Sequence, residues 1–317
     1  MKAAYIEKFG DLDNVIVGER PVVEPTPSQV QIEVHSVGIN PVDWKIVAGV
    51  LKDMMPHEFP LILGWDVSGV ISKVGDEVTD LKVGDEVYGY CRAPVIKEGT
   101  FAEYVCFEAQ HIVKKPKNLS FAQAAGIPLV TLTAWQALFE TGDVVEEQKV
   151  LIHAGAGGVG SMAIQLAKKV AGAFVVTTAS GKNHEYVKSL GADEAIDYTK
   201  ESFVEKGKEI APEGFDFVFD CVGGETARES YPIVKPGGMV VSIVGAVDKA
   251  EAEGLGIRGG NVFVKPDGKQ LQAICELIER EVLILPTVEE RPFDEVVEAL
   301  QSVKTQHTRG KIVLNIQ

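Results

Sequence analysis

The sequence predicts an α/β protein with two domains, one rich in short β-strands and one built on a doubly wound parallel sheet. The chain has 317 residues, and at roughly 150 residues per domain this length suggests two domains. Up to about residue 120, short apolar runs separated by turn residues are typical of a β-rich domain. Beyond that point, continuously apolar runs alternate with helical patterns, which indicates parallel strands joined by helices.

The β-rich domain is expected to span residues 1–122 and to be completed by residues 265–317. Its expected strands are Gln29 to Val37, Leu61 to Val74, Asp85 to Tyr90 and Phe101 to Phe107. In the closing segment we expect a strand from Lys311 to Ile316 after two helices, Gly268 to Arg280 and Phe293 to Val303. Gly-Asp pairs at residues 75–76 and 84–85 supply the tight turns.

The second domain is expected to span residues 123–264. Its expected strands are Lys149 to Ala154, Phe174 to Ala179, Glu194 to Asp197, Phe215 to Cys221, Met239 to Gly245 and Asn261 to Val264. Helices are expected at Gly158 to Ala171 and at Asn183 to Leu190. Buried strands that alternate with helices predict a sheet covered on both faces.

Charge and composition exclude several classes of protein. Lys plus Arg number 31 and Asp plus Glu 46, so the formal net charge is -15. We expect no nucleic-acid partner, because affinity for polyanions depends on cationic side chains. No stretch approaches the roughly 18 apolar residues of a membrane span, and the opening residues lack the apolar core of a secretory signal. We therefore expect a cytoplasmic protein with no membrane partner and with reduced cysteines.

A glycine-rich turn follows the first strand of the second domain. Its sequence has G-x-G-x-x-G spacing and comprises Gly155, Ala156, Gly157, Gly158, Val159 and Gly160. A buried strand enters it and an apolar-periodic helix leaves it, which is the context of a dinucleotide-binding site. Gly155 permits the tight turn, Gly157 lets the backbone approach a pyrophosphate, and Gly160 allows close packing of helix on strand. A glycine-rich connection without a ligand is the alternative.

The end of the next strand bears on the choice of nucleotide. NAD enzymes usually place an acidic residue there, against the ribose 2′-hydroxyl. Here no carboxylate appears before Glu185, whereas Ser180 and Lys182 can donate to a 2′-phosphate. The sequence therefore favours NADP(H). In the alternative, Ser180 only caps the next helix and Lys182 is solvated.

Several separated motifs resemble one family over essentially the whole chain. They are residues 38–45 (GINPVDWK), 63–69 (LGWDVSG), 84–89 (GDEVYG), the glycine turn with residues 165–168 (QLAK), and 309–314 (RGKIVL). In this order they resemble the zinc-independent medium-chain dehydrogenases/reductases of the quinone oxidoreductase group, which includes enone and alkenal reductases. The resemblance implies a GroES-like substrate domain and a Rossmann domain, with the active site in the cleft between them.

The resemblance is to the branch without zinc. The zinc branch has a Cys near the position of Asn40 and a His where this chain has Trp65. An amide and an indole cannot replace the thiolate and imidazole that a catalytic zinc needs. We therefore expect no metal, and we expect Asp66 to be satisfied by backbone or polar neighbours.

A conjugated acceptor is the easier substrate without a Lewis acid. Hydride added to an enone or a quinone leaves charge that spreads into an enolate or hydroquinonate, which hydrogen-bond donors can stabilise. The resemblance implies that Asn40 faces the nicotinamide and that Lys45 lies near the substrate oxygen. The plainer alternatives are turn chemistry for Asn40 and an exposed position for Lys45. Asp43 is expected to cap local backbone.

The resemblance also implies coenzyme contacts for Thr133, for Tyr198 near the adenine side, for Cys221 and Val222 at the end of the fourth strand, and for Val244 and Gly245 after the fifth. Packing is the alternative for each of them, and for Cys221 in particular. His153 is expected to be buried and hydrogen-bonded rather than catalytic.

The sequence thus predicts NADPH-dependent hydride transfer to a quinone or an α,β-unsaturated carbonyl compound. Two other functions stay open: a non-catalytic NADPH-binding or structural protein of the same fold, and an alcohol dehydrogenase acting on simple alcohols. The family's habit further implies a homodimer, formed through the edge near residues 261–264.

Overall fold

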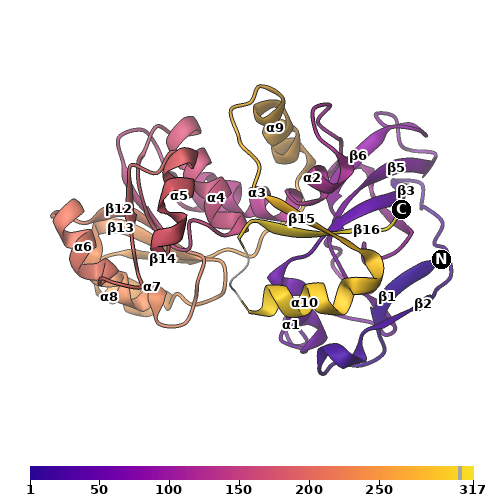
Figure 1. Ribbon diagram of the computed structural model, residues 1–317, viewed down its shortest axis with the longest axis horizontal. Coiled ribbons are helices and arrows are strands. Elements are labelled where there is room, and N and C mark those ends of the chain that lie inside the picture. Colours follow the sequence, from indigo (N-terminus) through magenta and orange to yellow (C-terminus); the bar gives the residue numbers. More distant parts are fainter. Residues whose placement is uncertain (306–308) are drawn as a thin grey trace. The chain divides into compact units, whose positions relative to one another are not determined.

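Figure 1 shows the computed structural model, which describes residues 1–305 and 309–317. The chain divides into two compact units. Unit 1 comprises Met1–Leu129, Lys265–Arg280 and Leu285–Gln317, and unit 2 comprises Val130–Val264 and Glu281–Ile284. Unit 1 extends beyond the expected boundary at residue 122 because helix α2 (Phe121–Ala125) packs on strands of this unit. Residues 281–284 belong to unit 2, where Gln165 bonds both the N–H and the C=O of Ile284.

Unit 2 is built on a parallel sheet, so the predicted fold class is confirmed. In the described residues the sheet has six strands in the order β11-β10-β9-β12-β13-β14. Their bounds are β9 Lys149–Ile152, β10 Phe174–Thr178, β11 Glu194–Ile196, β12 Phe215–Asp220, β13 Val234–Ser242 and β14 Arg258–Asn261. All neighbouring strands run parallel. The strand order reverses at β9, and ligands of open α/β sheets bind at such a switch point.

Unit 2 also contains helices, the first of which begins at the boundary with unit 1. They are α3 Pro128–Trp135, α4 Gly158–Gln165, α5 His184–Leu190, α6 Phe203–Ile210, α7 Thr226–Glu229 and α8 Lys249–Gly254, with shorter or wider turns η3 Gln136–Thr141, η4 Leu166–Val170, η5 Gly181–Asn183 and η6 Tyr231–Ile233. Phe203 and Ile210 of α6 pack against buried strand residues such as Val218. Helices α4 and α5 pack on each other, and α4 packs on β9. The helix expected at 158–171 is thus α4 continued by the wider turn η4.

Unit 1 holds the remaining strands in two sheets. One has the order β2-β1-β4, and the other runs β15-β16-β3-β5-β6-β8 with β7 also paired to β3. Their bounds are β1 Lys2–Ile6, β2 Ile16–Glu19, β3 Gln29–Gly38, β4 Leu61–Ile62, β5 Asp66–Val74, β6 Glu86–Tyr90, β7 Tyr104–Glu108, β8 Ile112–Lys114, β15 Val288–Pro292 and β16 Lys311–Asn315. The last strand, β16, pairs antiparallel with β3. The C-terminal segment therefore adds to the sheet formed by the N-terminal one.

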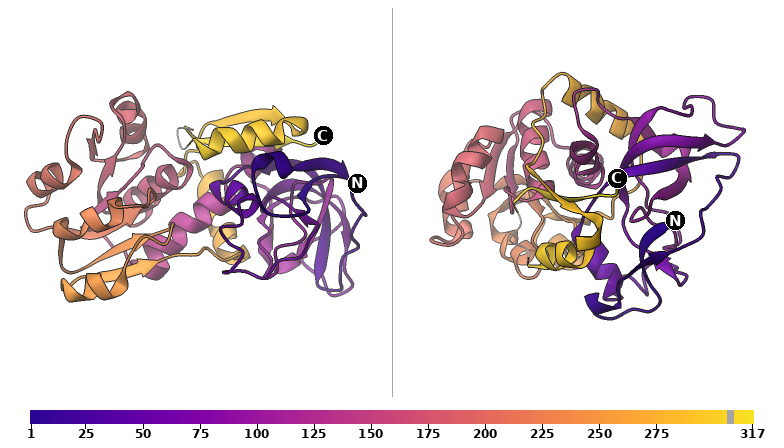
Figure 2. Two further views of the ribbon diagram at one scale, coloured as in Figure 1. Left: turned by 90° about the horizontal axis from the view of Figure 1, so that it is seen from below. Right: turned by 45° about the vertical axis from the view of Figure 1, so that its right-hand side comes forward.

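The helices of unit 1 besides α2 are α1 Pro41–Val47, α9 Gly268–Glu279 and α10 Val296–Lys304, with short turns η1 Leu12–Asn14, η2 Ala109–His111 and η7 Phe293–Glu295. Helices α1 and α10 pack on each other, and Figure 2 shows the yellow C-terminal segment beside the indigo N-terminal one. Among the described residues no helix is long and apolar enough to cross a membrane.

Two strand predictions are wrong. The single strand expected from Leu61 to Val74 is two strands, β4 and β5, because Gly64 between them has a φ of +86°. A Cβ on Gly64 would lie 2.1 Å from Cδ1 of Phe101, so the bend brings the backbone close to that ring. The strand expected at residues 261–264 is instead Arg258–Asn261, because these residues pair with β13.

Candidate functional site

The glycine turn lies at the carboxyl end of the central strand β9. The N–H of Gly155 donates to the carbonyl of Thr178 at 3.0 Å, which fixes the turn to the end of β10. Gly157 precedes the first residue of α4 and has an extended backbone. A Cβ on Gly160 would lie 2.3 Å from the carbonyl oxygen of Ala154, so this position admits no side chain. The turn therefore presents the unpaired N–H groups of a helix N-terminus, which bind anions.

The other predicted coenzyme residues of unit 2 follow the carboxyl ends of its strands. Ser180 and Lys182 follow β10, Tyr198 follows β11, Cys221 and Val222 follow β12, and Val244 and Gly245 follow β13. Tyr198, Val222 and Val244 are exposed, whereas Thr133 on α3 is buried. The parallel sheet brings these strand ends to one edge, where open α/β folds bind ligands.

A buried carboxylate that sequence reasoning missed shapes two of these loops. Asp220 ends β12, and its Oδ1 accepts the N–H groups of Val222 and Gly223 at 2.9 and 3.0 Å. Its Oδ2 accepts the hydroxyl of Ser242, the last residue of β13, at 2.8 Å. Ser242 Oγ in turn accepts the N–H of Val244 at 3.2 Å. Asp220 thus holds the loops after β12 and β13 together. The pKa of the neighbouring Cys221 thiol is raised well above its usual value, mainly by burial and to a smaller extent by the charge of Asp220.

His153 has a structural place, as the sequence predicts. It is buried, and its ring nitrogens lie 3.2 Å from Thr178 Oγ1 and 3.0 Å from Ser230 Oγ. Burial lowers its pKa to about 4, so the ring is neutral at physiological pH. Thr178 Oγ1 also accepts the N–H of Ala154 at 3.2 Å. His153 therefore supports the strand ends that carry the glycine turn.

Ser180, in the loop after β10, is expected either to donate to a 2′-phosphate or only to cap the next helix. Ser180 precedes the short helix η5, but its hydroxyl makes no capping bond to the backbone of that helix. Instead Oγ accepts the side-chain amide of Asn183 at 3.2 Å. Lys182 is exposed. Both side chains thus remain able to donate to a bound anion.

Asn40 belongs to a fully buried cluster at the start of α1 in unit 1. Its Nδ2 donates to Asp66 Oδ2 at 2.9 Å and points to the carbonyl of Gly38 at 3.4 Å. Its Oδ1 accepts the ammonium of Lys311 from β16. The protein itself therefore satisfies the amide that the sequence expects to face a substrate or coenzyme.

The same cluster holds one ammonium and two carboxyl groups. Lys311 also donates to the carbonyl of Ile39 at 2.7 Å and lies 4.0 Å from Asp66 Oδ2. Asp66 Oδ1 accepts the N–H of Leu129 at 2.8 Å, so this carboxyl is satisfied by backbone and polar neighbours as expected. Asp43 Oδ2 accepts the N–H of Asn40 at 2.7 Å, which is the expected cap, whereas its Oδ1 is buried without a partner. With a single positive charge for two buried carboxyl groups, one of them has to hold a proton.

Asp43 is the group that holds it. Burial raises its pKa to about 8, although the hydrogen bond from the Asn40 N–H and the charge of Lys311 each lower it. Burial likewise raises the pKa of Asp66, which lies closer to Lys311, to about 6. Burial also lowers the pKa of the Lys311 ammonium, whereas the charges of Asp66 and Asp43 raise it. Since Asp66 is the carboxyl within ion-pair distance of Lys311, the geometry favours an Asp66–Lys311 ion pair beside a neutral Asp43.

Replacing Asp43 with Asn is expected to make the protein less sensitive to rising pH. A carboxyl group whose pKa is raised in the folded state stabilises the fold at low pH and loses that contribution as the pH rises from about 4 to about 8. The amide of Asn keeps the hydrogen bond to Asn40 and does not ionise. Between pH 5 and pH 8 the free energy of unfolding of Asp43→Asn should therefore rise relative to that of the wild type by about 2 kcal/mol or more. Thermal unfolding at pH 5, 6.5 and 8 measures the difference. Parallel pH curves for the two proteins would contradict the assignment of the proton to Asp43.

Lys45 lies on α1, the helix that begins directly after Asn40 of the buried cluster. It is half-buried, and its Nζ lies 5.9 Å from the ring centroid of Trp44. Burial lowers the pKa of this ammonium, which makes it a stronger acid than an exposed lysine. Within the described chain no carboxylate forms an ion pair with it. The structure thus leaves Lys45 able to donate to a bound oxygen.

The donor chemistry of this cluster does not fit a catalytic zinc ion. Such an ion is held by thiolate, imidazole or carboxylate groups. Here the amide of Asn40 and the carboxyl of Asp66 already surround the ammonium of Lys311, and the neighbouring Trp65 packs on Tyr90 with ring centroids 6.0 Å apart. In residues 1–305 and 309–317 no three His, Cys, Asp or Glu side chains gather as metal ligands would.

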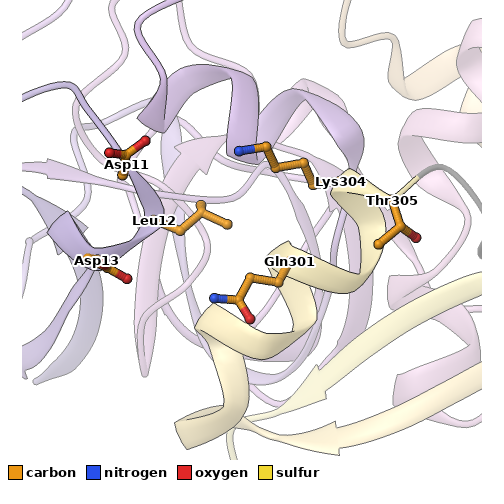
Figure 3. A pocket seen from close by; sticks show the side chains of 6 residues that line it. All are labelled: Asp11, Leu12, Asp13, Gln301, Lys304 and Thr305. Atoms are coloured by element: carbon orange, nitrogen blue, oxygen red, sulfur yellow. The ribbon is translucent and has the colours of Figure 1, made fainter.

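Two hollows lie on unit 1 away from the predicted residues. One of about 380 Å³ is lined by Asp11, Leu12, Asp13, Gln301, Lys304 and Thr305. Figure 3 shows Gln301 and Lys304 of α10 facing the η1 segment across it. The other, of about 430 Å³, is lined by residues 52–57. Neither contains a residue of the glycine turn or of the buried cluster.

Comparisons with known proteins cover both units. A family model described as "Alcohol dehydrogenase GroES-like domain" matches residues 26–117, and one described as "Zinc-binding dehydrogenase" matches residues 190–314. A 2-methylene-furan-3-one reductase of Solanum lycopersicum is 39% identical over 99% of this chain and 79% of its own length. An NADPH-dependent alkenal/one oxidoreductase of Arabidopsis thaliana, a chloroplastic protein, is also 39% identical over the same shares. The structure of the quinone oxidoreductase from Coxiella burnetii superposes with a TM-score of 0.89 at 33% identity and covers 100% of this chain and 99% of that one.

Proposed function

Because the chain belongs to the medium-chain dehydrogenase/reductase family, we propose that it uses NADPH to reduce a quinone or an α,β-unsaturated carbonyl compound. The observation that carries the proposal is the glycine turn at the switch point of the parallel sheet, followed along the chain by a strand end without a carboxylate. The relatives support it, since two of those at 39% identity are named as a 2-methylene-furan-3-one reductase and an NADPH-dependent alkenal/one oxidoreductase.

The residues of unit 2 fit the proposed coenzyme. The N–H groups at the start of α4 would hold the pyrophosphate, with Gly157 leaving room for it. Ser180 and Lys182 would hold the phosphate on the ribose. The loops that Asp220 fixes after β12 and β13 would border the nicotinamide half. NADPH supplies a hydride when it is bound.

In the proposed reaction unit 1 supplies the groups for the acceptor. Hydride addition to a conjugated carbonyl leaves negative charge on its oxygen, and a nearby ammonium stabilises that charge. Lys45 is the group we propose for this role, because burial has already made it a stronger acid. Asn40 is proposed as a positioning residue, since its amide joins Lys311 to Asp66 at the start of the helix that carries Lys45.

Replacing Lys45 with Met is expected to lower kcat/KM for the accepted enones by about a hundredfold, because one donor to a developing oxyanion is lost. The KM for NADPH should stay unchanged. Lys52→Met is the control, because this exposed lysine follows α1 without entering the proposed chemistry. Full turnover of Lys45→Met on every accepted enone would remove Lys45 from the mechanism.

A nucleotide-monitored panel tests the proposal as a whole. We expect oxidation of NADPH in the presence of 1,2-naphthoquinone or of members of an enone and enal series, and much slower oxidation of NADH. Simple saturated ketones should not be reduced. The proposal fails if NADPH binds but no quinone or enone is turned over, or if simple alcohols are oxidised instead.

We also propose that the chain is a cytoplasmic homodimer joined through the sheet of unit 2. In the described residues β14 forms one edge of that sheet, and an unpaired strand favours association. Phe263, just after this strand, is 41% exposed. Sedimentation equilibrium at twice the mass of 34.2 kDa is the expected result, and the mass of the single chain would contradict it.

A further inference from the structure

A second lysine reaches the loop that follows β10. Lys200 lies in the turn after β11, and its Nζ would be 3.6 Å from a Cβ placed on Gly181. Gly181 stands between Ser180 and Lys182, the two residues proposed to hold the ribose phosphate. The N–H of Ala179 donates to the carbonyl of Ile196 at 3.0 Å, so the two loops begin from paired strand ends.

A carboxylate lies between this lysine and the loop. Asp197 Oδ2 would be 2.6 Å from the same Cβ on Gly181, and it pairs with Lys200 Nζ at 3.4 Å. Its Oδ1 accepts the N–H and the hydroxyl of Thr199 at 3.1 and 2.6 Å. The hydroxyl of Thr199 holds the pKa of Asp197 below its usual range, so the group is ionised.

This carboxylate opposes the proposed choice of coenzyme. An ionised acid beside the loop repels a phosphate, which itself carries nearly two negative charges at neutral pH. Lys182 alone would only balance Asp197. The ammonium of Lys200, whose side chain is 77% exposed, leaves the loop with a net positive charge. The loop after β10 thus carries Ser180 and Lys182 and has Lys200 beside Gly181, where NAD enzymes usually place an acidic residue.

We propose that Lys200 is a second determinant of coenzyme choice: it neutralises Asp197 and donates to the phosphate on the ribose. The inference rests on the proposed function, because it assumes that the chain binds NADPH. Asp197 positions the ammonium and does not bind the ribose.

Calorimetric binding of adenosine 2′,5′-bisphosphate and of 5′-AMP to the full chain tests the role without any turnover. The wild type should bind the bisphosphate more tightly. Lys200→Ala should weaken bisphosphate binding about ten- to hundredfold, as expected for one lost charge-assisted hydrogen bond, and leave 5′-AMP binding unchanged or tighter. Adding Asp197→Asn to Lys200→Ala should recover part of the loss.

Lys188→Ala is the matched control. Lys188 pairs at 3.7 Å with Glu194, which begins β11, whereas Lys200 follows the end of that strand. The substitution Lys188→Ala therefore removes one positive charge from unit 2, as Lys200→Ala does, but leaves the loop after β10 unchanged. It should change neither affinity more than twofold. If Lys200→Ala binds the bisphosphate as tightly as the wild type, the role of Lys200 is overturned while the proposed function stands. If the wild type itself does not prefer the bisphosphate, both the inference and the choice of NADPH fail.

Discussion

Lys311→Met is expected to destabilise unit 1 by about 3–5 kcal/mol at neutral pH, because it leaves a buried carboxylate without its cation. Lys311 is 4% exposed and Asp66 is fully buried. Without the ammonium, Asp66 must take up a proton or remain charged in a medium of low polarity. The bonds of Lys311 to Ile39 and Asn40 are lost as well.

The loss should depend on pH in a defined direction. Below about pH 6 the wild-type Asp66 itself begins to take up a proton, so the two proteins should converge as the pH falls. Urea unfolding at pH 5 and pH 7.5, followed by fluorescence, measures this, since Trp44 and Trp65 lie in unit 1. Lys311→Met combined with Asp66→Asn should recover part of the loss, because the unpaired charge is then absent.

An exposed lysine provides the control for this prediction. Lys97 pairs with Glu58 at 2.7 Å, and both side chains are about half exposed. Lys97→Met should cost less than about 1 kcal/mol. Equal losses for Lys311→Met and Lys97→Met would show that the buried cluster contributes no more than a surface ion pair.

Gly157→Ala is expected to weaken NADPH binding about a hundredfold while the chain stays folded. A Cβ at this position meets a single atom, the carbonyl oxygen of Ala154 at 3.3 Å, so the fold needs only a small adjustment. The methyl group would stand where the backbone has to approach the pyrophosphate. Fluorescence titration with NADPH and thermal unfolding of the same samples separate binding from folding.

Substitutions at two other glycines provide controls for Gly157→Ala. Gly160→Ala should impair folding of unit 2 as well as binding, because its Cβ would lie 2.3 Å from the carbonyl oxygen of Ala154. Gly254→Ala, at the end of α8, should change neither, since no atom lies within 4 Å of its Cβ. Normal NADPH affinity in Gly157→Ala would mean that the glycine turn does not hold the coenzyme.

The sequence predicts the coenzyme side of the site better than the acceptor side. The turn from Gly155 to Gly160 and the strand ends of unit 2 are local patterns, each set by a strand and the few residues after it. The buried cluster depends on pairing between distant parts of the chain, since Asn40 and Lys311 are 271 residues apart. A single lysine in the apolar strand β16 does not show in advance which carboxylate it meets.

Two further misses have the same origin. Asp220 ends a strand like any other turn residue, and only the pairing of β12 with β13 brings it to Ser242. Asp197 and Lys200 follow β11, and only the pairing of β11 with β10 brings them to Gly181. Motif spacing along the chain identifies a loop, whereas the charges that face the loop are set by the neighbouring strands.

The fate of the hydride tests the proposed chemistry most directly. The chain would be supplied with each of the two forms of NADPH that carry deuterium at C4 of the nicotinamide, together with an accepted alkenone, and the product analysed by NMR. One of the two forms should deliver its deuterium to the carbon β to the carbonyl, giving a saturated ketone. Two results would contradict hydride transfer to a conjugated acceptor. One is an alcohol product with deuterium on the carbon that bears the hydroxyl group, and the other is a product free of deuterium with both forms.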